Sequence, residues 1–78
     1  SSFEFDKLQM VKSQLANASF KPEEVVLILQ GLKYDQSRLD FLTVLIEKQP
    51  ELKANEAQFM ACIDYELSKQ QLKNIFLK

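Results

Sequence analysis

The amino-acid sequence predicts an all-α fold, a compact stack of antiparallel helical hairpins built from four to five short helices. Apolar residues recur every three or four positions in several segments, as they do on the buried face of a helix. The chain has one glycine and two prolines among 78 residues, which is too few for a turn-rich β fold. No segment alternates between apolar and polar residues with a period of two, so we expect no strand. We therefore expect residues 1–78 to form a single all-helical domain.

The first two helices are expected at residues 4–17 and 22–30. In the first of them, three apolar residues share one face at helical spacing: Leu8, Val11 and Leu15. Pro22 suits the first position of the second helix, and the two glutamates that follow it would lie near the positive end of the helix dipole. Gly31 is expected just beyond the end of this helix, in the left-handed conformation.

The third helix is expected to begin at Asp35, whose carboxylate suits an N-cap, and to end before Pro50. Its inward face is expected to carry Leu39, Leu42 and Ile46. The fourth helix is expected over residues 54–63. The fifth is expected to begin at Ser68, because Ser68 and Gln71 match the spacing of a capping box.

A six-residue sequence pattern recurs at the start of three of these helices and predicts a structural repeat. It reads "FEFDKL" at residues 3–8, "YDQSRL" at residues 34–39 and "LSKQQL" at residues 67–72. Each copy places an apolar residue before the helix and a leucine on its inward face, which would give three similar helix starts. The apolar residues are Phe3, Tyr34 and Leu67, and the leucines are Leu8, Leu39 and Leu72. The pattern predicts two and a half repeats of about 32 residues. The alternative is three unrelated amphipathic helices with ordinary caps.

The segment "EEVVLILQGLKYDQSRLDFLTVL" at residues 23–45 resembles the family catalogued as domain of unknown function 4476. Eight residues fill the family's pattern of two helices joined by an aromatic-Asp step: Glu24, Val25, Ile28, Leu29, Leu32, Tyr34, Asp35 and Leu39. Glu24 replaces the usual Gln of that pattern, and Arg38 replaces the usual Lys. The resemblance implies a compact all-helical domain without an assigned activity, often appended to extracytoplasmic proteins of bacteria. It transfers no functional residues, because the pattern is structural.

The composition disfavours several classes of function. The net charge is −1, so there is no electrostatic basis for binding nucleic acid. No apolar run reaches the roughly 18 residues of a membrane-spanning helix. The chain has no histidine, and its single cysteine, Cys62, therefore has no His partner for nucleophilic catalysis. We expect no catalytic residue, metal site or cofactor, and we expect Cys62, Tyr34 and Tyr65 to lie in the core.

These observations favour a non-enzymatic structural or protein-interaction module. The alternative is a helical carrier, or a small enzyme, that uses an apolar cavity between helices. The expected partner is another protein or the remainder of a longer parent chain, and a homodimer is a further alternative. The two central helices are apolar around most of their circumference, so that one face could remain exposed for a partner. We expect Leu45 to be enclosed, and we expect any contact surface to include Val26 or Phe41.

Overall fold

The computed structural model describes residue 6 and residues 19–77. These residues form four α-helices: α2 (Pro22–Gly31), α3 (Asp35–Lys48), α4 (Glu56–Met60) and α5 (Glu66–Leu77). A 3-10 helix, η1 (Pro50–Asn55), leads directly into α4. None of the described residues lies in a strand, and the predicted all-α fold is therefore confirmed for this part of the chain. The expected helix at residues 4–17 and the first copy of the repeat lie outside the described residues, except for Asp6, which is helical.

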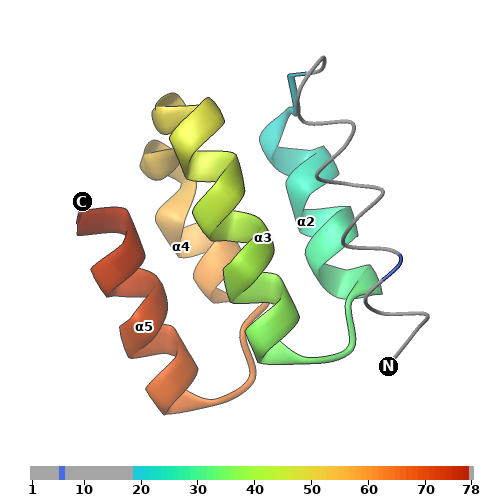
Figure 1. The fold of residues 1–78 in the computed structure, drawn as a ribbon, viewed down its shortest axis with the longest axis vertical. Coiled ribbons are helices and arrows are strands. Elements are labelled where there is room, and N and C mark those ends of the chain that lie inside the picture. The colour runs from blue at the N-terminus through green and yellow to red at the C-terminus, as the bar shows by residue number, and fades with distance from the viewer. Residues whose placement is uncertain (1–5, 7–18, 78) are drawn as a thin grey trace.

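The α2 helix, the α3 helix, the η1–α4 segment and the α5 helix run in alternating directions and are joined by short connections (Figure 1). The chain descends through α2, rises through α3, descends through η1 and α4, and rises again through α5. The α3 helix contacts both η1 and α5, while α4 contacts α2, η1 and α5. As a result α3 is enclosed by neighbours on more than one side.

The helices share one hydrophobic core, to which α3 contributes the most residues. Two edge-to-face aromatic pairs extend through it, with ring centroids 6.5 Å apart for Phe20 and Phe41 and 6.1 Å apart for Phe59 and Phe76. Among the described residues, the buried apolar ones are Val25, Leu29, Leu32, Leu39, Phe41, Leu42, Leu45, Ile46, Leu52, Phe59, Ile63, Leu72 and Phe76. The predicted burial of Leu39, Leu45 and Leu72 is confirmed.

Pro22 and Pro50 occupy the positions predicted for them. Pro22 is the first residue of α2, and the carboxylate of Glu24 accepts a hydrogen bond of 2.8 Å from the backbone N–H of Lys21. The α3 helix ends at Lys48, just before Pro50, because a residue that precedes proline is disfavoured in the helical conformation. Pro50 then starts η1 rather than a loop, so helical structure resumes four residues before the expected residues 54–63.

Three predicted helix termini are wrong. The α4 helix ends at Met60, three residues before the expected Ile63. Gly31 is the last residue of α2 and has no positive φ, so it does not form the left-handed cap. Instead the N–H of Leu32 turns back to the carbonyl groups of Ile28 and Leu29. The α5 helix begins at Glu66, two residues before Ser68, so Ser68 does not cap it. Leu67 therefore lies inside a helix, whereas Tyr34 lies just before one, and these two residues are not equivalent as the repeat required.

The aromatic residues that precede two of the helices are exposed rather than buried. Tyr34 is 60% exposed and Tyr65 is 72% exposed, and Leu67 is 71% exposed. The prediction that both tyrosines lie in the core is wrong. Both tyrosines directly precede a helix and lie at the end of the molecule where α3 and α5 begin. Cys62 is half-buried, so the prediction that it lies in the core is met only in part.

Candidate functional site

A buried polar cluster surrounds Arg38, near the start of α3. Arg38 is 8% exposed, and its Nη1 lies 2.9 Å from Asp35 Oδ1 and 3.0 Å from Asp64 Oδ2. The remaining guanidinium N–H groups donate to the end of α2. Nε donates to the carbonyl oxygens of Leu29 and Leu32 at 3.0 and 3.1 Å, and Nη2 donates to Leu32 at 2.7 Å. The guanidinium thus donates hydrogen bonds to carbonyl groups at the C-terminal end of α2, where carbonyl groups lack partners within the helix. It also places a positive charge at the negative end of the α2 dipole.

Asp35 is the buried carboxylate of this cluster, and it holds the loop before α5. Its Oδ1 accepts the backbone N–H of Asp64 at 3.1 Å, and its Oδ2 accepts the backbone N–H of Tyr65 at 3.0 Å. Sequence analysis placed Asp35 as the N-cap of its own helix, and this is wrong. Tyr34 occupies the N-cap position without a side-chain cap, because the Asp35 carboxylate is directed to the neighbouring loop instead.

The electrostatics of the cluster favour the charged forms of both groups. Burial alone would raise the pKa of the Asp35 carboxyl, but hydrogen bonds from the Asp64 and Tyr65 backbone and from the Arg38 and Ser68 side chains lower that pKa below its ordinary value. Burial alone would likewise lower the pKa of the Arg38 guanidinium, and the carboxylates of Asp64 and Asp35 raise it. An ion pair locked in this way is suited to fixing structure and unsuited to exchanging protons.

A second polar contact, at the other end of α3, joins the residue that follows α3 to the segment that precedes α2. The buried Gln49 amide pairs with the backbone of Phe20 in both directions. The N–H of Phe20 donates to Gln49 Oε1 at 2.7 Å, and Gln49 Nε2 donates to the Phe20 carbonyl at 3.0 Å. Both ends of α3 are therefore fixed to neighbouring segments by buried side chains.

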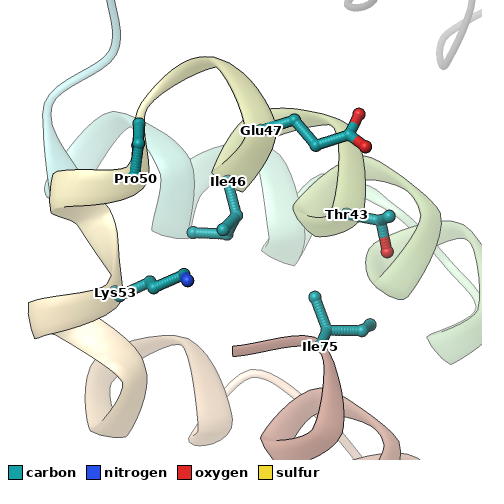
Figure 2. A pocket seen from close by; sticks show the side chains of 6 residues that line it. All are labelled: Thr43, Ile46, Glu47, Pro50, Lys53 and Ile75. Carbon is teal, nitrogen blue, oxygen red and sulfur yellow. The ribbon is translucent and has the colours of Figure 1, made fainter. Parts of the chain in front are cut away.

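A hollow of about 360 Å³ lies between the second half of α3, η1 and α5 (Figure 2). It is lined by Thr43, Ile46, Glu47, Pro50, Lys53 and Ile75. The side chains of Ile46 and Ile75 project into it from opposite sides, and the Lys53 ammonium points into it from η1. Thr43, Glu47 and Pro50 are exposed, so the hollow opens to solvent at its rim.

In the part of the chain that the structure describes, the other reactive side chains are not gathered into a site. The Cys62 thiol lies 3.8 Å from the carbonyl oxygen of Gln58, and burial raises the pKa of this thiol above its ordinary value. Such a thiol is a poor nucleophile, because the thiolate is the reactive form. Within residues 19–77, no three Cys, Asp or Glu side chains are arranged to hold a metal ion. No helix in this range is long and apolar enough to cross a membrane.

The two residues expected at a partner surface have different surroundings. Phe41 is fully buried and packs edge-to-face on Phe20, so its assignment as a partner contact is wrong. The reason is that α3 is enclosed on several sides, which leaves its apolar flank no access to solvent. Val26 is half-buried against the core, and its role as a contact remains a prediction.

The cluster around Arg38 was missed by sequence analysis. Asp35 and Arg38 are spaced as a pair on one helix face, and this spacing is a signal that could have suggested an ion pair. Nothing in the sequence connects them to Asp64, because the contact joins residues 26 positions apart.

A family model described as "Domain of unknown function (DUF4476)" matches residues 1–76, which is nearly the whole chain. No curated protein and no solved structure matches the chain.

Proposed function

Since the chain belongs to the family described as domain of unknown function (DUF4476), a description that assigns no activity, we propose that it is a non-enzymatic module that binds another protein. The observation that supports this proposal is that the buried polar side chains form structural hydrogen bonds to the backbone. Asp35, Arg38 and Gln49 are each committed to tying helix ends together. Among the described residues, no buried side-chain nitrogen or oxygen lacks a hydrogen-bond partner.

An enzyme would need polar groups that converge on a cavity and can change their protonation state. The carboxylate and guanidinium whose pKa values are shifted, Asp35 and Arg38, face the loops at one end of the bundle and do not line the hollow. The hollow is open at its rim, rather than enclosed as a carrier's cavity would be. These two facts favour an interaction module over the alternative of a carrier or small enzyme.

The surface best suited to a protein partner is the end of the bundle where α3 and α5 begin. We call it the tyrosine end and define it as Tyr34, Tyr65 and Leu67, all of which are largely exposed. The hydrogen bond from Tyr65 N–H to Asp35 brings the two helix starts together, so the three side chains belong to one region. Tyrosine combines a large apolar ring with a polar group, and it is enriched at protein interfaces.

The proposal is tested by affinity capture with the full chain, read by mass spectrometry. The variant pair Tyr65→Ser and Leu67→Ser removes apolar area from the tyrosine end. Leu27→Ser is the matched control, because Leu27 is 68% exposed and lies in the middle of α2, outside the three residues of the tyrosine end. A partner that is captured by the parent and by Leu27→Ser, but lost from the tyrosine-end variants, supports the proposal. Equal capture by all variants, or no reproducible partner, argues against it.

Sedimentation velocity distinguishes a second copy from a different protein. If the parent chain dimerises and the tyrosine-end variants stay monomeric, the partner is another copy of the chain. Circular dichroism of each variant should match the parent, because exposed side chains contribute little to stability.

A further inference from the structure

We propose that the hollow between α3, η1 and α5 binds an aliphatic monocarboxylate, with its hydrocarbon chain between Ile46 and Ile75 and its carboxylate at the Lys53 ammonium. This is a small-molecule site, and it does not rest on the proposed protein partner. The hollow and the tyrosine end lie on different parts of α3 and α5, so each can be tested without disturbing the other.

Lys53 carries the argument for a carboxylate. Its side chain is half-buried and its Nζ points toward the centre of the hollow (Figure 2). The ion pairs formed by the described residues join Arg38 and Lys69 to carboxylates, and Lys53 takes part in none of them. A cation that borders an apolar surface without a counter-ion is complementary to an anion attached to an apolar chain.

The polar groups of the other lining residues are directed elsewhere, so Lys53 is the polar side chain that points to the centre of the hollow. The Thr43 hydroxyl donates a hydrogen bond of 2.8 Å to the carbonyl oxygen of Leu39 in its own helix. The Glu47 side chain extends along α3, and its carboxylate points away from the centre of the hollow (Figure 2). Ile46, Ile75 and Pro50 supply apolar surface. The centre of the hollow therefore offers the positive charge of Lys53 and the apolar surface of Ile46 and Ile75, while Thr43 and Glu47 add polar groups to its lining.

The size of the hollow limits the ligand to a short chain. A volume of about 360 Å³ is near the lower end of the range for small-molecule sites. An open hollow of this size buries only part of a short chain, so binding is weak, with a dissociation constant on the order of 1 mM for hexanoate.

The test is a titration of the ¹⁵N-labelled full chain with hexanoate, followed by amide chemical shifts. Hexanol and hexylammonium are the matched ligands, because they keep the hydrocarbon chain and change only the charge. We expect saturable shifts at Thr43, Glu47 and Lys53 with hexanoate, and weaker binding of both other ligands. Equal or tighter binding of hexylammonium, or no saturable shift with hexanoate up to about ten times the expected dissociation constant, would overturn the proposal.

Variants of Lys53 separate the contribution of its charge to hexanoate binding from the contribution of the apolar surface. Lys53→Met keeps an apolar stem without the ammonium, and it should weaken hexanoate about two- to fivefold while leaving hexanol unchanged, as expected for a partly exposed ion pair. Lys53→Gln should act in the same way, which guards against a local packing effect of Met. Lys48→Met is the control, because Lys48 is exposed and does not line the hollow. Unchanged hexanoate affinity in both Lys53 variants would refute the assignment.

The C-terminus of a peptide also presents a carboxylate next to an apolar side chain, so a titration with a peptide is needed to distinguish it from a small free acid. A short peptide that ends in Leu is titrated as the free acid and as the amide. If hexanoate binds, the proposal stands whether or not the peptide acid also binds. If only the peptide acid binds, the hollow is a docking site for protein tails and the small-molecule proposal is wrong.

Discussion

Replacing Asp35 with Asn should destabilise the domain strongly, although the two side chains have the same shape. The Asp35 carboxylate is 8% exposed and accepts two backbone N–H groups as well as Arg38 Nη1. An amide in its place offers one oxygen to these donors and turns an NH2 group toward another donor. Asp64 still faces Arg38, but its side chain is 66% exposed and compensates little.

The size of the effect follows from these contacts. Hydrogen bonds to charged groups contribute about 1.5–3 kcal/mol each, and a buried ion left without its partner costs about 3–5 kcal/mol. Because Arg38 keeps its three bonds to carbonyl groups, we expect Asp35→Asn to lower the free energy of unfolding by about 3 kcal/mol. A domain of this length has a total stability of about 4–12 kcal/mol, so the loss is readily measured.

The assay is urea denaturation followed by circular dichroism, with Asp40→Asn as the control. Asp40 lies on the exposed side of α3 and accepts one hydrogen bond of 3.0 Å from Gln36. Its replacement should change stability by no more than about 0.5 kcal/mol. If Asp35→Asn proves as stable as Asp40→Asn, the cluster does not stabilise the fold and the reasoning is refuted.

The pH dependence of stability gives an independent measure of the same group. The folded-state pKa of Asp35 is lowered below its ordinary value of 3.8. Its contribution to stability is therefore fully present above the unfolded pKa and is lost as the pH falls through the folded pKa. We expect the parent to lose stability below about pH 4.5, and the Asp35→Asn variant to lose less over the same interval. Parallel acid profiles for the two proteins would contradict this.

Other substitutions test the core and the second polar contact. Leu39→Ala and Leu72→Ala should each lower the free energy of unfolding by about 2–5 kcal/mol in urea, and a loss below about 1 kcal/mol would contradict their burial. Phe41→Glu should abolish the helical circular dichroism signal, because it places a charge in a fully buried site; a folded variant would show that Phe41 is accessible after all. Gln49→Ala should cost about 1–3 kcal/mol by the same urea assay, since it leaves the Phe20 backbone without its partners, and a neutral result would mean that water replaces the amide.

The inward faces of the helices could be predicted because periodicity reports directly on burial. Leu39, Leu42 and Ile46 repeat at helical spacing, and all three are buried. Proline was equally informative, since Pro22 begins α2 and Pro50 follows the end of α3. These signals are local, and the structure did not alter them.

The predictions that were wrong or missing concern features that depend on contacts between residues distant in the sequence. Periodicity finds one buried face of a helix, but it does not tell how many neighbours the helix has, and Phe41 is buried because α3 is enclosed on several sides. Asp35 fits an N-cap by residue type, and only the approach of the loop containing Asp64 gives its carboxylate a different use. The hollow could not be predicted either, because it brings together Lys53 and Ile75, which lie on different helices separated by α4 and the α4–α5 loop.

The bonds from Asp35 to the α4–α5 loop have a consequence for hydrogen exchange. Backbone N–H groups in surface loops usually exchange with solvent through small local openings. The N–H groups of Asp64 and Tyr65 can open only if Asp35 is released, and that release also leaves the buried Arg38 without its least exposed counter-ion. Detachment of α5 is thereby coupled to disruption of the α2 and α3 ends. This loop should exchange almost as slowly as the core helices, and α3 and α5 should open together as one cooperative unit.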